Sequence, residues 1–288
     1  MTTSSRRFEQ LKKVLCCSEC RGNLIFTASE AACEKCAAVY PIRQGKIYFV
    51  EVPKTTDELD TIKGRLKRWL GKYYYKIGLN VLAPTFPFNY LRKIKQFFDP
   101  AQQIVVDVGC GNNRIDENII GIDLFDYEAV DVVCDLIKLP FKPDSVDGFA
   151  SRSVLEHVPN PALIVKQLYE CTKPGGYGVH LIPFLYPFHA SPHDYQRFTL
   201  EGQKVLFTGW EIIEQTNPTG PVTLVLLCLI EFLSIVLSFG NLKVKGYLYL
   251  FFCGILFPFK YLDFIFANRK SFVTLAPSIL ALVRKYGK

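Results

Sequence analysis

The stretch Val105-Val-Asp-Val-Gly109-Cys-Gly111 decides how the rest of the chain is interpreted. Its β-type apolar residues run directly into two glycines, which indicates a buried strand followed by a tight turn. In open α/β sheets a ligand lies beyond the carboxyl ends of the strands, where the strand order reverses. Glycines at that place let the backbone approach a ligand closely. The stretch therefore predicts a ligand site at the carboxyl edge of a sheet.

Short apolar runs alternate with other segments beyond this stretch. Strands are expected at 104–108, 119–124, 130–135, 146–151, 177–182 and 210–215, with 278–285 as a candidate seventh. A helix is expected at 162–172, ending at Lys173-Pro-Gly-Gly176. This alternation predicts a mostly parallel sheet covered on both faces, which is a Rossmann-like α/β fold. The first two strands are closer in sequence than a helical crossover normally allows, so we expect a short turn or a loop between them.

Acidic residues end three of the expected strands. Asp107 lies in the first strand, Asp123 ends the second, and Asp135 ends the third. An acid at the end of the second strand can accept both hydroxyls of a ribose, and Asp135 is placed to meet an adenine amino group. A nicotinamide dinucleotide is the nearest rival ligand. It is disfavoured because Arg114 stands where G-x-G-x-x-G has its third glycine.

Residues 101–215 resemble the class I S-adenosylmethionine-dependent methyltransferases. The motifs D-x-G-x-G, LPF, LEHV and KPGG of one broad bacterial group are here Asp107–Gly111, Leu139–Phe141, Leu155–Val158 and Lys173–Gly176. The resemblance implies a seven-stranded sheet, S-adenosyl-L-methionine as cofactor, and methyl transfer. The implied cofactor residues are Asp107, Gly109 and Gly111 at the methionine part, Asp123 at the ribose, Asp135 and Leu136 at the adenine, and Ser151 at the end of the fourth strand. The family usually has another glycine after Gly111, where this chain has two asparagines.

Four of the ten cysteines form two pairs near the start of the chain. Cys17 and Cys20 make the first C-x-x-C, and Cys33 and Cys36 follow twelve residues later. Two such pairs surround one tetrahedral centre, which suits a structural Zn²⁺. Cys16 could compete with Cys17 as a ligand. The run from 14 to 50, with its Tyr-Pro-Ile and Gly-Lys-Ile segments, also resembles the zinc-ribbon activator subunits found with tRNA and protein methyltransferases.

The segment after the fifth expected strand supplies candidates for the reaction. Methyl transfer to oxygen or nitrogen requires alignment of the acceptor, and a hydroxyl must also lose a proton. Two of the four histidines, His189 and His193, lie there beside Asp194 and Arg197. We predict His193 or His189 as general base, Asp194 as the residue that orients it, and Arg197 as the contact for an anionic acceptor group. Alternatively, these residues only lock a loop. For His157, a structural or cofactor-adjacent role is favoured.

Two apolar runs follow, at 221–239 and 247–259. The first contains one charge, Glu231, and as a helix it would be about 28 Å long, close to the ~30 Å hydrocarbon core of a bilayer. The second is shorter and contains Pro258. If both crossed the bilayer, the lysines between them would oppose the positive-inside tendency. A helical hairpin dipped into one leaflet is therefore expected, with packing on the protein or in a dimer interface as the alternative.

These features divide the chain into five segments. They are a zinc ribbon at 1–50, a basic aromatic connector at 51–100, a methyltransferase core at 101–219, a membrane-associating hairpin at 220–270, and a last strand and tail at 271–288. The composition, 49% hydrophobic and 21% charged, excludes a disordered polar chain. The formal charge of +7 suits an anionic partner such as RNA, a membrane face or a phosphorylated substrate, without choosing among them.

The expected function is methyl transfer to an oxygen or nitrogen of a lipid-linked, glycan or other small-molecule acceptor. The N-terminus has no apolar signal segment, so we expect a cytoplasmic protein that contacts the inner membrane face through 221–266. The run around the paired histidines resembles methyltransferases linked with cell-surface glycans and lipids. Methylation of rRNA or tRNA is one alternative, although it gives no reason for an apolar hairpin. A non-catalytic zinc-ribbon adaptor is another, although the three strand-end acids argue against it.

Overall fold

The computed structural model describes residues 3–53, 78, 81–189 and 193–287. The basic run at 63–76 of the connector, which suits either contact with an anionic surface or a plain solvated helix, lies outside the described residues. Within them, one sheet has the strand order β1-β2-β3-β4-β7-β6-β5-β8-β9-β11-β10.

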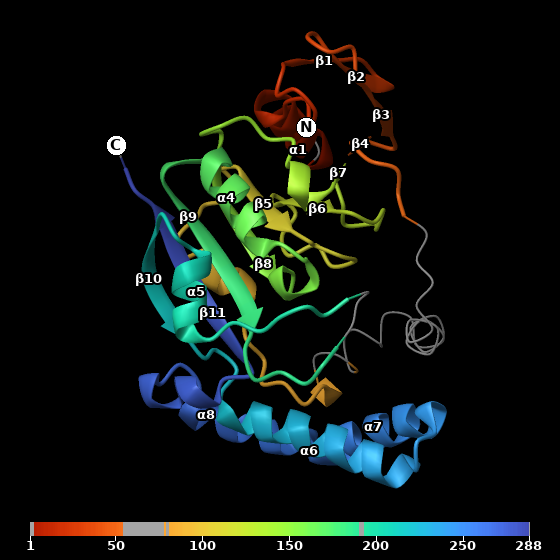
Figure 1. The fold of residues 1–288 in the computed structure, drawn as a ribbon, viewed down its shortest axis with the longest axis vertical. Helices are drawn as coiled ribbons and strands as arrows, with labels where there is room; N and C mark the ends of the chain where they lie inside the picture. Colours follow the sequence, from red (N-terminus) through yellow and green to blue (C-terminus); the bar gives the residue numbers. More distant parts are fainter. Residues whose placement is uncertain (1–2, 54–77, 79–80, 190–192, 288) are drawn as a thin grey trace.

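The seven strands from β7 to β10 in this order form the central sheet (Figure 1). They are β5 (Val105–Val108), β6 (Ile120–Asp123), β7 (Val132–Val133), β8 (Val146–Arg152), β9 (Thr172–Pro183), β10 (Trp210–Thr216) and β11 (Ser278–Lys285). The first five pair in parallel, and β11 lies antiparallel between β9 and β10. The order reverses between β5 and β8, so a crevice for a ligand is expected at their carboxyl ends. The predicted Rossmann-like sheet is confirmed.

Alternate residues of the strands supply two hydrophobic cores, one on each face of the sheet. Helices α1 (Thr3–Val14), α4 (Pro161–Cys171) and α5 (Leu200–Leu206) contribute to the larger core with Val106 and Phe149. Helix α3 (Tyr90–Ile94) packs on the other face against strand residues that include Val105 and Ala150. Helix α4 begins with Pro161 after the side-chain cap of Asn160, whose oxygen accepts the Leu163 amide hydrogen. These helices leave the loops at the carboxyl edge to form the site.

Two connections differ from the usual α/β pattern. Between β5 and β6 the chain makes turns and no helix, as the short spacing predicts. The prediction that Lys173–Gly176 would separate the helix from the fifth strand is wrong. Strand β9 already starts at Thr172, which pairs with Val146, and the next pairing is Gly148 with Tyr177. The glycine-rich residues therefore bulge out of a continuous strand, and Gly175 has a positive φ of 79°.

The cysteine-containing segment is an extension of the sheet. It contains β1 (Leu24–Phe26), β2 (Glu30–Cys33), β3 (Val39–Arg43) and β4 (Lys46–Tyr48). Strand β4 pairs in parallel with β7, with Ile47 opposite Val132. An isolated antiparallel bridge also joins Leu15 to Phe141. Backbone pairing thus joins the segment to the central sheet, although the sequence suggests a separate module in front of it.

The two apolar runs form an antiparallel helical pair between β10 and β11. They are α6 (Pro221–Ser238) and α7 (Leu242–Leu256), followed by η4 (Phe257–Leu262), α8 (Asp263–Phe266) and η5 (Lys270–Leu275). Figure 1 shows the pair as a layer below the sheet, with the arrowhead of β9 directed toward it. By length and composition, Pro221–Ser238 and Leu242–Phe266 could each cross a membrane. Asp263 anchors the layer because its carboxylate accepts the amide hydrogens of Val222 and Thr223 at the start of α6.

Candidate cofactor and active site

The turn after β5 has the backbone shape that its glycines predict. Gly109 and Gly111 have φ values of 65° and 58°, in the region that favours glycine. A side chain at Gly109 would collide with Val154, since its Cβ would lie 2.6 Å from Val154 Cγ2. At Gly111 no atom of the described part of the chain lies within 4 Å of the same position. Gly109 thus allows two loops to pack, whereas Gly111 leaves room for a ligand.

Asp123 connects the ends of the first two strands. One carboxylate oxygen accepts the Gly111 amide hydrogen over 2.9 Å, and the other accepts that of Phe125 over 3.0 Å. The side chain is largely buried, and burial raises its pKa although these amides lower it. The carboxylate therefore holds the glycine turn in place at the same edge where a ribose is expected.

Asp107 is the second buried acid at this edge. Burial raises its pKa to about 7; nearby Arg152 works against the rise, and Asp123 adds to it. The ionised form of this carboxyl group is thus less favoured than that of a free aspartate. A cationic group such as the α-ammonium of a methionine moiety would favour the ionised form.

The remaining predicted cofactor residues occupy different environments. Asp135 caps the short helix η2 (Leu136–Lys138) by accepting the Ile137 amide hydrogen over 2.9 Å, and Leu136 is buried. These two residues remain at the carboxyl edge. The Ser151 hydroxyl is instead buried and lies 2.8 Å from Nδ1 of His180. Ser151 therefore differs from the other predicted cofactor residues, because its side chain already has a partner in the core.

Sequence reasoning missed the role of Asp131. Arg114, which replaces the third glycine of the dinucleotide motif, donates to Asp131 over 2.9 and 3.1 Å. Arg7 of α1 donates to the same carboxylate over 3.1 Å, and the Gly121 amide donates to it over 2.9 Å. Asp131 thus joins α1, the shortened loop and β6. The sequence offers one signal of this role. Asp131 is an acid next to the apolar residues Val130, Val132 and Val133, and Arg114 has no role in the predicted site.

The four paired cysteines converge. The Sγ atoms of Cys17, Cys20, Cys33 and Cys36 all lie within 4.8 Å of one another. Thiolates about 2.3 Å from a tetrahedral Zn²⁺ lie roughly 3.8 Å apart, so this donor set fits the metal. Burial raises the pKa of Cys17, but several hydrogen bonds, the strongest with Tyr40 at 3.0 Å, together outweigh it and lower this pKa to about 6. Cys16 is outside the cluster, and burial raises the pKa of its thiol.

The cysteine segment also contacts the loop that follows Asp135. Arg21 donates to the Leu139 carbonyl over 2.5 Å, and the Cys16 amide donates to the Pro140 carbonyl over 2.9 Å. Leu139 and Phe141, the apolar residues of the LPF motif, are both fully buried. The cysteine cluster is therefore connected by hydrogen bonds to the side of the site where adenine is expected.

The structure brings together three of the four predicted reaction residues. Arg197 makes a two-pronged ion pair with Asp194, and the His189 amide donates to Asp194 over 2.8 Å. His189 Nδ1 lies 3.7 Å from the same carboxylate. His193 is outside this group, and its exposed ring packs near Tyr195. Asp194 thus contacts His189 and Arg197, so His189 is the better candidate for the general base.

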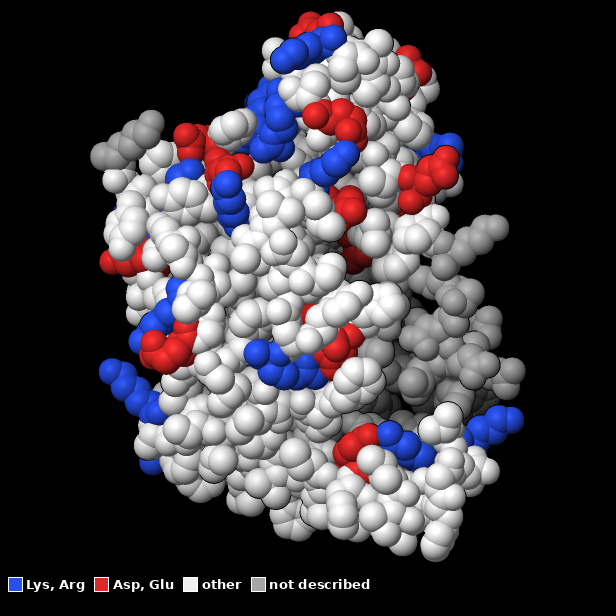
Figure 2. Space-filling view, in the orientation of Figure 1, with Lys and Arg blue, Asp and Glu red and all other residues white. Residues whose placement is uncertain are grey.

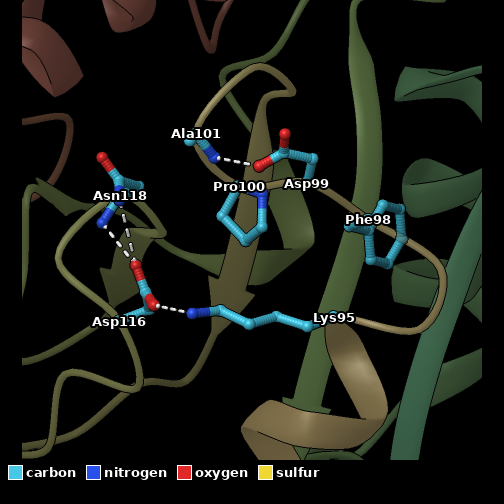
Figure 3. A pocket seen from close by; sticks show the side chains of 7 residues that line it. All are labelled: Lys95, Phe98, Asp99, Pro100, Ala101, Asp116 and Asn118. Carbon is cyan, nitrogen blue, oxygen red and sulfur yellow. Dashed lines mark hydrogen bonds and ion pairs between the residues drawn. The ribbon is translucent and has the colours of Figure 1, made fainter.

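A pocket lies at the opposite edge of the sheet. Figure 3 shows its lining, which includes the ion pair between Lys95 and Asp116 at 2.8 Å. The volume is about 280 Å³. Its residues precede β5 and β6, which places the pocket at the amino ends of these strands. It therefore does not belong to the site at the carboxyl edge.

Comparisons with known proteins agree with this geometry. Residues 86–214 match the family model described as a methyltransferase domain. The ubiquinone biosynthesis O-methyltransferase of Xanthomonas axonopodis pv. citri (strain 306) is 25% identical over 142 residues, which are 41% of this chain and 57% of the relative. The chain thus matches little more than half the length of that relative.

Two solved methyltransferases also resemble the chain. Phosphoethanolamine N-methyltransferase 2 of Haemonchus contortus, in complex with S-adenosyl-L-methionine, is 17% identical with a TM-score of 0.46, covering 82% of this chain and 61% of its own. An S-adenosylmethionine-dependent methyltransferase of Mesorhizobium loti is 14% identical with a TM-score of 0.40, covering 67% and 96%.

The strand order and the site at its reversal point define a Rossmann-like α/β domain that binds its ligand at the carboxyl edge. Together with the family match, they identify residues 86–214 as the main part of a methyltransferase domain.

Proposed function

We propose that this protein transfers a methyl group from S-adenosyl-L-methionine to an oxygen or nitrogen of a lipid-linked or other small-molecule acceptor at a membrane surface. One observation carries the membrane part of the proposal: the loop that follows β9, where the acceptor is expected, is hydrogen-bonded to the end of the insertion that contains the apolar helical pair. The cofactor part rests on Asp107, Asp123 and Asp135 around the glycine turn.

Contacts between this loop and the insertion after β10 support the proposal. The amide hydrogens of Phe184 and Leu185 are donated to the carbonyls of Pro277 and Ala276, over 2.9 and 3.2 Å. Burial raises the pKa of Tyr186, and Cys253 of α7 adds to the rise. An acceptor that reaches the end of β9 from the α7 side would therefore pass an apolar surface. The relative from Xanthomonas is named for an O-methylation in ubiquinone biosynthesis, and ubiquinone is a lipid.

The helical pair and the short helix α8 that follows it expose a broad apolar surface. Phe239, Leu242 and Phe264 are 94%, 80% and 85% exposed, and the lowest part of the molecule in Figure 2 carries few charges. Glu231 is the only charged residue of α6, and it is paired with Lys245 of α7. A large exposed apolar patch of this kind indicates a lipid or protein contact. Both helices lie along the protein in Figure 1, which favours insertion of one face into a single leaflet.

We expect the wild-type chain to float with anionic phospholipid vesicles in a density gradient. Phe239→Glu, Leu242→Glu and Phe264→Glu together should lower the floating fraction at least about tenfold, because each removes roughly 2 kcal/mol of apolar transfer. The matched control places three glutamates at Ile25, Val39 and Val205, which are 56%, 54% and 75% exposed elsewhere. It should float like the wild type. A wild-type chain that remains at the bottom of the gradient contradicts membrane association.

The acceptor class can be determined with methyl-labelled cofactor and a fractionated cell extract. Incorporation should occur in the lipid or small-molecule fraction, and it should disappear when the extracted lipids are omitted. Label in RNA would instead favour the alternative of an RNA methyltransferase. Cofactor binding without transfer to any fraction would favour a non-catalytic adaptor.

A further inference from the structure

Three side chains converge at the carboxyl edge, and two of them, Glu156 and His157, have no role in the chemistry described so far. Glu156 and His157 belong to the short helix η3 (Leu155–His157) after β8, and His189 belongs to the loop after β9. From Glu156 Oε1, the Nε2 atom of His157 is 3.5 Å away and that of His189 is 3.7 Å away. The three atoms that could bind a ligand all lie within 4.8 Å of one another.

The carboxylate of Glu156 has no hydrogen-bond partner among the described residues. The side chain is 0% exposed, and neither of its oxygens accepts a hydrogen bond from any residue that the structure describes. A buried ionised carboxylate without a compensating partner costs several kcal/mol. This cost implies that a cation or a proton lies beside the carboxylate when the chain is folded.

Both imidazoles are oriented for metal binding. His157 Nδ1 donates its hydrogen to the carbonyl of His193, and His189 Nδ1 lies 3.3 Å from the carbonyl of Pro187. A carbonyl oxygen only accepts, so these contacts place the ring hydrogen on Nδ1 and leave the Nε2 lone pair toward Glu156. Metal-bound histidines usually have this arrangement, with the second nitrogen held by a carbonyl or carboxylate.

A proton is the competing explanation. Arg197 Nη2 also lies 3.3 Å from His189 Nδ1. If Arg197 donates there, the ring hydrogen of His189 moves to Nε2 and faces Glu156. At 3.7 Å this contact is too long for a good hydrogen bond, and the Nε2 atom of His157 would still face the carboxylate with a lone pair.

We propose that Glu156, His157 and His189 bind a divalent transition metal ion of the Zn²⁺ type, separate from the four-cysteine site. Ligands about 2.1 Å from a tetrahedral ion lie roughly 3.4 Å apart, close to the two distances measured from Glu156. Two imidazoles exclude Mg²⁺ and Ca²⁺ as preferred ions, because these bind oxygen ligands. Three protein ligands leave at least one open position, which is typical of reactive rather than structural sites.

The metal site gives the acceptor a chemical class, provided that the proposed methyl transfer is correct. An acceptor hydroxyl in the open position loses its proton to solvent more easily than a free hydroxyl. The oxygen then attacks the methyl carbon, the carbon–sulfur bond breaks, and the sulfur keeps the electron pair. The acceptor is therefore a hydroxyl compound whose oxygen can occupy the open position. His189 acts as a metal ligand in this scheme, and no histidine base is needed.

Metal titration tests the site independently of activity. The full chain, freed of metal and kept reduced, is titrated with CoCl2 and then with ZnCl2. The wild type should bind two equivalents, one with the intense thiolate absorption of the cysteine cluster and one with weak visible bands only. Glu156→Gln and His189→Gln should each lose the weak bands and retain the thiolate absorption. Cys33→Ser should lose the thiolate absorption and retain the weak bands.

A control variant and the melting temperatures distinguish a metal ion from a proton at Glu156. His193→Gln, which retains the backbone carbonyl that His157 contacts, should still bind two equivalents. Without metal, the melting temperature of Glu156→Gln should equal or exceed that of the wild type. Binding of ZnCl2 at the cysteine cluster should raise the melting temperature of both chains, and the wild type should show a further rise that Glu156→Gln lacks. One equivalent in both wild type and Glu156→Gln would overturn the proposal in favour of a proton. Two equivalents without any methyl transfer would instead count against the proposed function alone.

Discussion

Replacing Cys33 with serine should remove the zinc ion of the cysteine cluster and destabilise the whole protein. A structural zinc site contributes on the order of 10 kcal/mol of binding free energy to folding. Loss of the metal should also destabilise the central sheet, because β4 pairs with β7 and residues Leu15 and Cys16 pair with the LPF segment. We expect a loss of about 4 kcal/mol, which lowers the melting temperature by roughly 10 °C in a chain of this size.

Metal analysis and calorimetric melting would test this expectation. Cys16→Ser is the matched control, since Cys16 neighbours a ligand and is buried but lies outside the cluster. It should keep its zinc and lose only about 1 kcal/mol. A Cys33→Ser chain that lacks zinc but melts at the wild-type temperature would mean that the cysteine segment is energetically independent of the sheet.

Asp123→Ala should abolish measurable binding of S-adenosyl-L-methionine. The carboxylate fixes the turn through the amides of Gly111 and Phe125, and it is the expected acceptor for the ribose hydroxyls. Charge-assisted hydrogen bonds contribute about 1.5–3 kcal/mol each, so the loss of two should weaken binding at least about 100-fold. Isothermal titration calorimetry with wild type and variant measures this directly.

A neighbouring carboxylate supplies the control for that experiment. Asp126 belongs to the same loop, but it is partly exposed and pairs with Lys46 and Tyr48. Asp126→Asn should therefore bind the cofactor within about twofold of the wild type. Equal affinities of Asp123→Ala and wild type would refute the assigned ribose site, and no binding by the wild type would refute the cofactor itself.

Local patterns predict the strands because burial on both faces requires continuous apolar runs. The runs around Val105, Ile120 and Val146 were therefore identified closely, as was helix α4. The bulge at Lys173–Gly176 was missed because glycine and proline indicate a break in either a loop or a strand. Only the pairing of Thr172 with Val146 distinguishes the two.

The strand-end acids could be predicted from local patterns, whereas the histidine cluster depends on contacts between distant segments. The sequence by itself determined that Asp107, Asp123 and Asp135 share one edge, because parallel strands end on the same side of a sheet. It also predicted the cluster of four cysteines, since the two C-x-x-C pairs are recognised from their local spacing. Only the tertiary structure decided that Asp194 contacts His189 and not its neighbour His193, because a loop has no fixed period that relates adjacent side chains.

Long-range pairings were likewise decided by the tertiary structure alone. The parallel pairing of β4 with β7 joins segments about 85 residues apart, and the meeting of Glu156 with His189 depends on the neighbouring positions of β8 and β9. Such contacts arise when separate segments bury their apolar faces together. No local pattern of residues encodes that event, so the glycine turn after Val108 could indicate the cofactor site but not the metal site beside it.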